Sequence, residues 1–223
     1  MNDSIVVSHA TKVLGGRRVL DNVTFEIPGP GVYGFSGVNG SGKTMLFRAI
    51  SGLVRLTSGS VEVFGQVVGR DVDFPVAMGI AFESSGFWDE LTGRGNLLSL
   101  ADIRGVVGET EVDEALRRVG LDPNDTRPFS SYSMGMRQRL VVAQAVMESP
   151  RLLIMDEPTN SLDVSGIDLV AGIVREEAKR GATVLVASHN EPTLEALYER
   201  HFHMRDGRLT EEGPGEGAMS DEG

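Results

Sequence analysis

Short apolar runs alternate with segments of helical pattern along most of the chain. The runs with the length and aliphatic content of buried strands lie at 32–36, 152–155 and 184–187. The segments after them that are predicted to be helices span 42–50, 166–180 and 191–198. At the start of the second helix, Ser165 and Asp168 are the expected capping pair. This alternation predicts βα units and therefore an α/β fold with a mainly parallel sheet.

Two other regions have a different pattern. The stretches 5–27 and 60–64 are rich in β-forming residues and in glycine and proline turns, which predicts a small antiparallel sheet attached to the core. Residues from about 87 to 145 instead carry helical patterns, such as those at 96–104 and 111–119, separated by glycines. These patterns predict a helical lobe inserted into the α/β core.

The last residues differ from the rest of the chain. We expect 1–210 to form one domain and 211–223 to form a separate tail. The tail holds five acidic residues and four glycines but no lysine or arginine. Such a segment cannot bury enough apolar surface to offset the entropy lost on ordering, so disorder is expected. An acidic interaction tail is the alternative.

Composition limits the possible classes of protein. The formal net charge of -11 argues against a nucleic-acid partner. The absence of cysteine excludes disulfides, thiol catalysis and cysteine-ligated metals. The first residues lack the pattern of a signal peptide, and no apolar stretch approaches the ~18 residues that span a bilayer. We therefore expect a cytoplasmic protein whose membrane role, if any, is exerted through a partner.

The strongest chemical signal is the segment 37–44, Gly-Val-Asn-Gly-Ser-Gly-Lys-Thr, which fits the phosphate-binding pattern G-x-x-x-x-G-K-[ST]. It lies between a predicted strand and a predicted helix, as the pattern requires. The glycines allow backbone N–H groups to point at phosphate oxygens. We expect Lys43 to reach the β- and γ-phosphates of ATP and Thr44 to bind Mg²⁺. The candidate ATP-binding residues are Gly37, Asn39, Gly40, Ser41, Gly42, Lys43 and Thr44.

Two adjacent carboxylates, Asp156 and Glu157, end the apolar run at 152–155. The carboxyl ends of parallel strands are where open α/β sheets bind ligands. Asp156 is predicted to hold Mg²⁺, directly or through water, and Glu157 to polarise the water that attacks the γ-phosphate. On these two residues alone, an acidic strand end that caps the next helix is an equal alternative.

With these motifs in this order, residues from about 5 to 210 resemble the ATP-binding cassette of ABC transporters. The segment 131–139, Ser-Tyr-Ser-Met-Gly-Met-Arg-Gln-Arg, is similar to the signature loop of that family. The resemblance implies that Ser133, Met134, Gly135 and Met136 cap the ATP held by the opposite subunit of a dimer. Without the resemblance, Ser133 would be only the N-cap of a helix.

Two more segments carry the resemblance. The segment 157–163, Glu-Pro-Thr-Asn-Ser-Leu-Asp, is similar to the family's link from the catalytic acid into the D-loop. This implies that Asp163 communicates across the dimer interface. His189 matches the family's switch histidine, which implies that it binds the γ-phosphate and helps Glu157 to hold the water. From the residues alone, Asp163 is a turn residue and His189 a structural histidine.

The chain departs from the family pattern at several positions. Glu83 stands where the family has a glutamine that contacts Mg²⁺, so a carboxylate is expected in the metal shell. Leu14 stands where an aromatic residue usually stacks on adenine, so weak nucleotide selectivity is expected. Met134 and Met136 replace a glycine and a glutamine of the signature, a variant that resembles the cassettes of drug, antibiotic and polysaccharide exporters.

The resemblance implies an ATPase that acts as a dimer with a second cassette, identical or different. Its closure on ATP would drive a separate transmembrane permease, with export as the favoured direction and the inner face of the membrane as its location. The segment 86–92, with Phe87 and Trp88, lies where such cassettes meet the permease; burial inside the lobe is equally expected. The alternatives are a nucleotide-sensing or weakly hydrolysing cassette in a heterodimer and an ABC ATPase without a transport role.

Overall fold

The computed structural model describes residues 3–82, 86–189 and 191–212. It divides into two compact units, one formed by residues 1–75 with 185–223 and the other by residues 76–184. Strand β8 (Thr183–Ala187) crosses the boundary between these ranges. Each unit is described separately.

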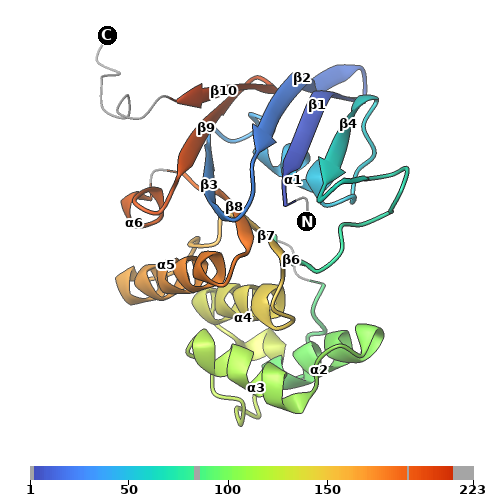
Figure 1. The fold of residues 1–223 in the computed structure, drawn as a ribbon. Coiled ribbons are helices and arrows are strands. Elements are labelled where there is room, and N and C mark those ends of the chain that lie inside the picture. Colours follow the sequence, from blue (N-terminus) through green and yellow to red (C-terminus); the bar gives the residue numbers. More distant parts are fainter. Residues whose placement is uncertain (1–2, 83–85, 190, 213–223) are drawn as a thin grey trace. The chain divides into compact units, whose positions relative to one another are not determined.

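The first unit contains an antiparallel sheet in the order β2-β1-β4-β5 (Figure 1). Its strands are β1 (Ile5–Leu14), β2 (Arg17–Ile27), β4 (Ser58–Val63) and β5 (Gln66–Val67). Ile5 is opposite Ile27 on one side and Val63 on the other, and all three side chains are buried. The expected small antiparallel sheet is thus confirmed.

The same unit holds strands β3 (Gly31–Ser36), β9 (Arg200–Arg205) and β10 (Arg208–Glu212), in the order β10-β9-β3. β9 runs parallel to β3 and antiparallel to β10. Helix α1 (Lys43–Ile50) follows β3. Phe35 packs with its ring centroid 5.1 Å from that of Phe47 on α1 and 5.0 Å from that of Phe202 on β9. This aromatic group joins the helix to the strands.

The helix predicted at 191–198 is shorter than expected, because α6 spans only Pro192–Glu195. Beyond it the amides of Leu197 and Tyr198 bond carbonyls three residues back, which tightens the chain into a turn. The Glu199 amide then donates to the Val32 carbonyl at 2.8 Å. The chain has to leave the helix at this point to enter β9, and tertiary pairing overrides the local helical pattern.

The second unit places helices against a parallel strand pair, β6 (Met78–Ala81) and β7 (Leu152–Asp156). Its helices are α2 (Gly93–Arg104), α3 (Glu109–Arg118), α4 (Met134–Val146) and α5 (Val164–Lys179), with a single 3₁₀ turn η1 (Phe129–Ser131). α4 packs on β6 so closely that a Cβ at Gly79 would lie 1.8 Å from the Ala145 carbonyl oxygen. The predicted helices at 96–104 and 111–119 are present as α2 and α3 (Figure 1).

The start of α5 differs from the expectation. Its N-cap is Asp163, whose side chain accepts a hydrogen bond from the Gly166 amide at 2.9 Å. Ser165, which was expected to cap the helix with Asp168, lies inside the first turn and donates to the Asp163 carboxylate. Asp163, two positions before Ser165, is a good N-cap residue whose charged carboxylate strengthens the hydrogen bond to the Gly166 amide, so the helix begins two residues earlier. Across the described residues, no helix is long and apolar enough to cross a membrane.

Candidate nucleotide-binding site

The loop 37–44, called the phosphate loop below, joins β3 to α1, as its sequence predicts. Two of its glycines are required by their surroundings. Gly37 has φ +139°, and a Cβ there would lie 2.2 Å from the Met204 carbonyl oxygen. Gly42 has φ +113°, and a Cβ there would lie 2.8 Å from the Val19 carbonyl oxygen. No side chain other than hydrogen fits at either position.

The polar groups of the phosphate loop suit an anion. Gly42 is the N-cap of α1, and no described side chain caps the helix or places an acidic group in its first turn. The positive end of the helix dipole is therefore available to a ligand. Lys43 is buried, and its Nζ donates to the Gly37 carbonyl at 2.5 Å. Ser41 Oγ is buried without a hydrogen-bond partner among the described residues. A phosphate would supply the acceptor that this hydroxyl lacks.

The other loop residues are accessible. Asn39, Gly40 and Thr44 are exposed, so the loop presents polar groups outward around the buried Ser41 and Lys43. Leu14 ends β1 opposite Arg17 in the β1–β2 hairpin, and 45% of its surface is exposed. An accessible apolar side chain of this kind can contact a base without stacking on it.

His189 lies in the same unit as the phosphate loop, just beyond the end of β8, and is exposed. The residue before it, Ser188, donates its amide hydrogen to the Phe35 carbonyl at 3.2 Å. Phe35 is two residues before Gly37. His189 therefore leaves β8 close to the point where β3 enters the phosphate loop.

Asp156 and Glu157 lie in the second unit, at the end of β7. Asp156 is buried and Glu157 half-buried. Glu157 has φ +52°, an unusual backbone conformation for a residue other than glycine. The Gln138 side chain of α4 donates to the Pro158 carbonyl at 3.0 Å and to the Glu157 carbonyl at 3.4 Å. Helix α4 thus fixes the strained turn that carries the two acids.

The second unit also contains a pocket of about 600 Å³, called the signature pocket below. It brings together segments more than twenty residues apart, Ser133–Met136 and Ser161–Asp163. Ser133 caps α4 by accepting from the Met136 amide at 3.2 Å, and Asp163 caps α5. Both helices therefore begin at this pocket with their positive ends toward it. Of the four signature residues, Ser133 and Met134 are exposed, and 66% of the surface of Met134 is accessible.

Two arginines in the signature pocket were not assigned from the sequence. Arg139 lies 3.6 Å from the Asp163 carboxylate, and the Gly166 amide and Ser165 hydroxyl keep the pKa of that carboxyl below its usual value. Arg127 pairs with Asp125 at 2.7 Å and lowers the pKa of Asp125. Arg127 also donates to Met136 Sδ at 3.8 Å. Arg139 belongs to the quoted signature segment, whereas Arg127 stands in a loop without any recognisable pattern.

Some predicted features lie outside the described residues. These are Glu83, the expected metal ligand, and residues 213–223 of the acidic tail. Of the other predicted site residues, the phosphate loop, Leu14 and His189 belong to the first unit. Asp156, Glu157 and the signature pocket belong to the second.

Comparison with known proteins identifies the family of the chain. The family model described as ABC transporter matches residues 20–160. An uncharacterised ABC transporter ATP-binding protein of Bacillus subtilis, YybJ, is 37% identical over 205 residues, which cover 92% of this chain and 94% of the relative. The bacitracin transport ATP-binding protein BcrA of Bacillus licheniformis is 36% identical, over 96% of this chain and 71% of the relative.

A solved bacterial ABC transporter cassette, determined as a dimer, has the same fold. It superposes with a TM-score of 0.80 at 23% identity, over 93% of this chain and 97% of the cassette. The α/β fold with its antiparallel sheet and added helices is thereby confirmed. The chain belongs to the ABC transporter family, as one of its ATP-binding, ATP-hydrolysing subunits.

Proposed function

We propose that this chain hydrolyses Mg-ATP in a head-to-tail dimer and thereby drives a separate transmembrane permease in the direction of export. The observation that carries the proposal is the phosphate loop. Its Ser41 hydroxyl is buried without a hydrogen-bond partner among the described residues, no described side chain caps the start of α1, and Lys43 is a buried cation. A nucleotide triphosphate supplies an acceptor for the Ser41 hydroxyl and negative charge for Lys43 and the helix start.

The roles of the residues follow from their chemistry. Lys43 and the backbone of the phosphate loop hold the β- and γ-phosphates, and Leu14 contacts the base. The Thr44 hydroxyl and the Asp156 carboxylate are hard oxygen ligands of the kind that Mg²⁺ prefers, with Glu83 as a further proposed ligand. When bound, the metal neutralises charge on the phosphate oxygens.

Glu157 and His189 are the proposed catalytic side chains. The Glu157 carboxylate orients the attacking water and accepts its proton, and the strained backbone at Glu157 fixes the direction in which that side chain leaves the chain. His189 donates a hydrogen bond toward the γ-phosphate. Positioning and charge stabilisation together account for catalysis in this class of reaction.

The signature pocket is the proposed second half of the site. Its two helix starts and the Ser133 hydroxyl would face the γ-phosphate held by the partner subunit, and Asp163 would lie at the interface. The related cassette was solved as a dimer, which supports this arrangement. Closure on ATP and opening after hydrolysis would then move the permease.

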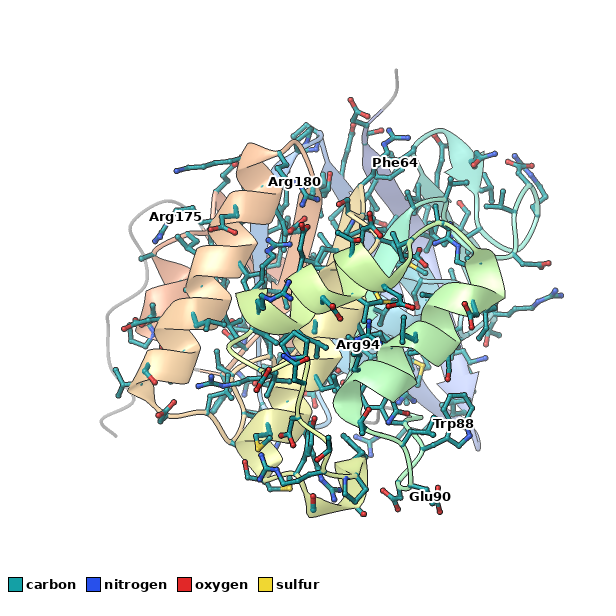
Figure 2. All side chains as sticks on the ribbon, turned by 90° about the horizontal axis from the view of Figure 1, so that it is seen from below. Phe64, Trp88, Glu90, Arg94, Arg175 and Arg180 are labelled. Carbon is teal, nitrogen blue, oxygen red and sulfur yellow. The ribbon has the colours of Figure 1, made fainter. Side chains whose placement is uncertain are left out.

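The proposed permease contact is the segment 86–92. Phe87 packs on Phe129, with ring centroids 5.2 Å apart, so it contributes to the interior of the second unit. Trp88 is 48% exposed and projects from the ribbon (Figure 2). Its backbone amide donates to Asn96 Oδ1 at 2.7 Å, and its carbonyl accepts from Asn96 Nδ2 at 3.0 Å. Since Asn96 is fully buried, the backbone of Trp88 is held in place while its indole stays accessible, which suits an aromatic anchor.

Export is favoured by the signature variant Tyr132–Met136 and by the relatives named for bacitracin transport. Peptide antibiotics are therefore the first substrate class to test. The chain would lie on the inner face of the membrane through its permease.

The experiment that tests this function uses Glu157→Gln. Loss of the catalytic carboxylate should lower the turnover number for ATP about 10²–10⁴-fold. It should also trap the ATP-bound dimer, seen as a shift to twice the mass in size-exclusion chromatography with light scattering. The trapped protein, tagged and purified from native membranes, should bring down a polytopic membrane protein.

The control is Glu114→Gln, a change of the same kind at an exposed position of α3. It should leave turnover unchanged. Normal turnover in Glu157→Gln would remove Glu157 from catalysis. Recovery of ribosomal or DNA-repair proteins without a membrane protein would leave the chemistry intact and refute the transport role.

A further inference from the structure

We propose that Tyr198 is a positioning residue for ATP hydrolysis, because it holds the chain that carries His189 against the strand that enters the phosphate loop. The inference rests on the role proposed above for His189. It concerns the first unit alone, where Tyr198, Ser188, His189 and β3 all lie.

The ring of Tyr198 lies directly against Gly34 in β3. A Cβ built at Gly34 would be 2.0 Å from Tyr198 Cδ2 and 2.1 Å from Tyr198 Cε2, so only glycine allows this contact. Gly34 is three residues before Gly37, the first residue of the phosphate loop. The ring therefore packs directly on the segment that sets the position of that loop.

The backbone of Tyr198 is fixed on both sides. Its own amide donates to the Glu195 carbonyl at 3.1 Å, which ties it to α6. The next amide, that of Glu199, donates to the Val32 carbonyl of β3 at 2.8 Å. The side chain is thus carried by a turn that is itself bonded to β3.

The hydroxyl of Tyr198 reaches the residue before His189. Its oxygen lies 2.9 Å from Ser188 Oγ, and Ser188 is buried. β8 ends at Ala187, so strand pairing no longer fixes the chain at Ser188. Two hydrogen bonds of Ser188, from its amide to the Phe35 carbonyl and between its hydroxyl and that of Tyr198, hold the chain there instead.

The consequence concerns His189 rather than ATP binding. A hydrogen bond that holds the residue before His189 fixes the direction in which the imidazole leaves the strand. Removal of the Tyr198 hydroxyl would leave the phosphate loop itself unchanged. Misplacement of a catalytic group by a fraction of an ångström lowers the rate without lowering substrate affinity.

The test is a double-mutant cycle with Tyr198→Phe and Ser188→Ala, read by steady-state ATP hydrolysis of the full-length chain. Each variant should lower kcat roughly tenfold while the KM for ATP changes less than about twofold. The double variant should be no slower than either single one, because both changes break the same hydrogen bond.

The matched control is Tyr33→Phe. Tyr33 is buried in the same unit, and its hydroxyl donates at 3.1 Å to the carbonyl of Gly29, which lies before the start of β3, whereas the phosphate loop follows the end of that strand. The Tyr33→Phe variant should lose about as much stability as Tyr198→Phe and keep a normal kcat. An equal fall in kcat for Tyr33→Phe and Tyr198→Phe would assign the effect to general loosening and overturn the inference.

A further variant separates this inference from the function on which it rests. His189→Ala should abolish most turnover. If it does and Tyr198→Phe retains a normal kcat, the positioning role is wrong and the proposed site stands. If His189→Ala hydrolyses ATP normally, the role of His189 is wrong, and the inference fails with it.

Discussion

At the scale of single residues, several site residues adopt unfavourable backbone conformations or bury polar groups at a cost in stability. Gly37 and Gly42 adopt positive φ in places where no side chain fits, and Glu157 adopts positive φ although it has one. This backbone conformation costs a non-glycine residue about 1–3 kcal/mol. The hydrogen bonds from the Gln138 side chain help to hold Glu157 in it. Ser41 buries a hydroxyl that has no hydrogen-bond partner in the described part of the chain. These costs are expected where a protein is organised for a ligand rather than for its own stability.

Ser41→Ala should separate the effect of this hydroxyl on ligand binding from its effect on stability. An unsatisfied buried hydroxyl costs about 1–3 kcal/mol, so its removal should raise the free energy of unfolding of the nucleotide-free chain by about 1 kcal/mol. The same change removes a hydrogen bond to phosphate and should weaken ATP binding about tenfold. Denaturant unfolding and calorimetric titration with a non-hydrolysable ATP analogue measure the two effects.

Ser51→Ala provides the comparison for this prediction. Ser51 is fully buried, but its hydroxyl is bonded to the Arg48 carbonyl at 3.1 Å. It should therefore lose about 1 kcal/mol of stability and keep its ATP affinity. If Ser41→Ala is destabilised as much as Ser51→Ala, the Ser41 hydroxyl has a role in the nucleotide-free fold and the prediction is wrong.

At the scale of elements, the strands were easier to predict than the ends of the helices. The aliphatic runs at 32–36, 152–155 and 184–187 became β3, β7 and β8 with a shift of at most one residue at either end. The end of α6 and the cap of α5 were mispredicted, because each depends on a competing contact: pairing with β3 in one case and the Asp163 carboxylate in the other. Such contacts are not encoded in hydrophobic periodicity.

An ion pair between α3 and α5 is another contact that hydrophobic periodicity does not predict. Glu177 on α5 is completely buried and accepts from Arg118 on α3 at 2.7 Å, across 59 positions of sequence. Arg180 lies 2.6 Å from its other oxygen. Arg180 follows Glu177 at the i,i+3 spacing of an ion pair, whereas nothing in the sequence marks Arg118 as a partner of Glu177. The buried carboxylate makes this pair a stability determinant of the second unit.

Arg118→Met should therefore destabilise the protein by about 2–3 kcal/mol, because Glu177 keeps only Arg180 as a charged partner and loses a charge-assisted hydrogen bond. The midpoint of urea unfolding measures this. Arg117→Met changes an exposed neighbour whose pair with Asp113 is 3.9 Å long, and it should cost less than about 0.5 kcal/mol. Equal effects of the two variants would show that the Glu177 pair adds nothing to stability.

At the scale of the whole molecule, the proposed chemistry is shared between the two units. The phosphate loop and His189 belong to one, and the carboxylates with the signature pocket belong to the other. The contiguous motifs among them could be predicted, since each has a fixed spacing in the sequence. Tyr198 and Arg127 could not, because their importance lies in neighbours that only the folded chain supplies. The proposed permease would be recognised on the surface of the chain, where Trp88 is the candidate contact.

Trp88→Ala tests that recognition without touching the ATP site. Truncation of an aromatic anchor at the centre of an interface costs about 2 kcal/mol or more, so the yield of permease recovered with tagged protein should fall roughly thirtyfold. ATP hydrolysis by the isolated chain should not change. Ile103→Ala is the matched control, since Ile103 is 74% exposed on α2 of the same unit. If Ile103→Ala loses the permease equally, exposed apolar area in general rather than the Trp88 indole mediates docking. If Trp88→Ala retains the permease in full, the segment 86–92 is not the contact.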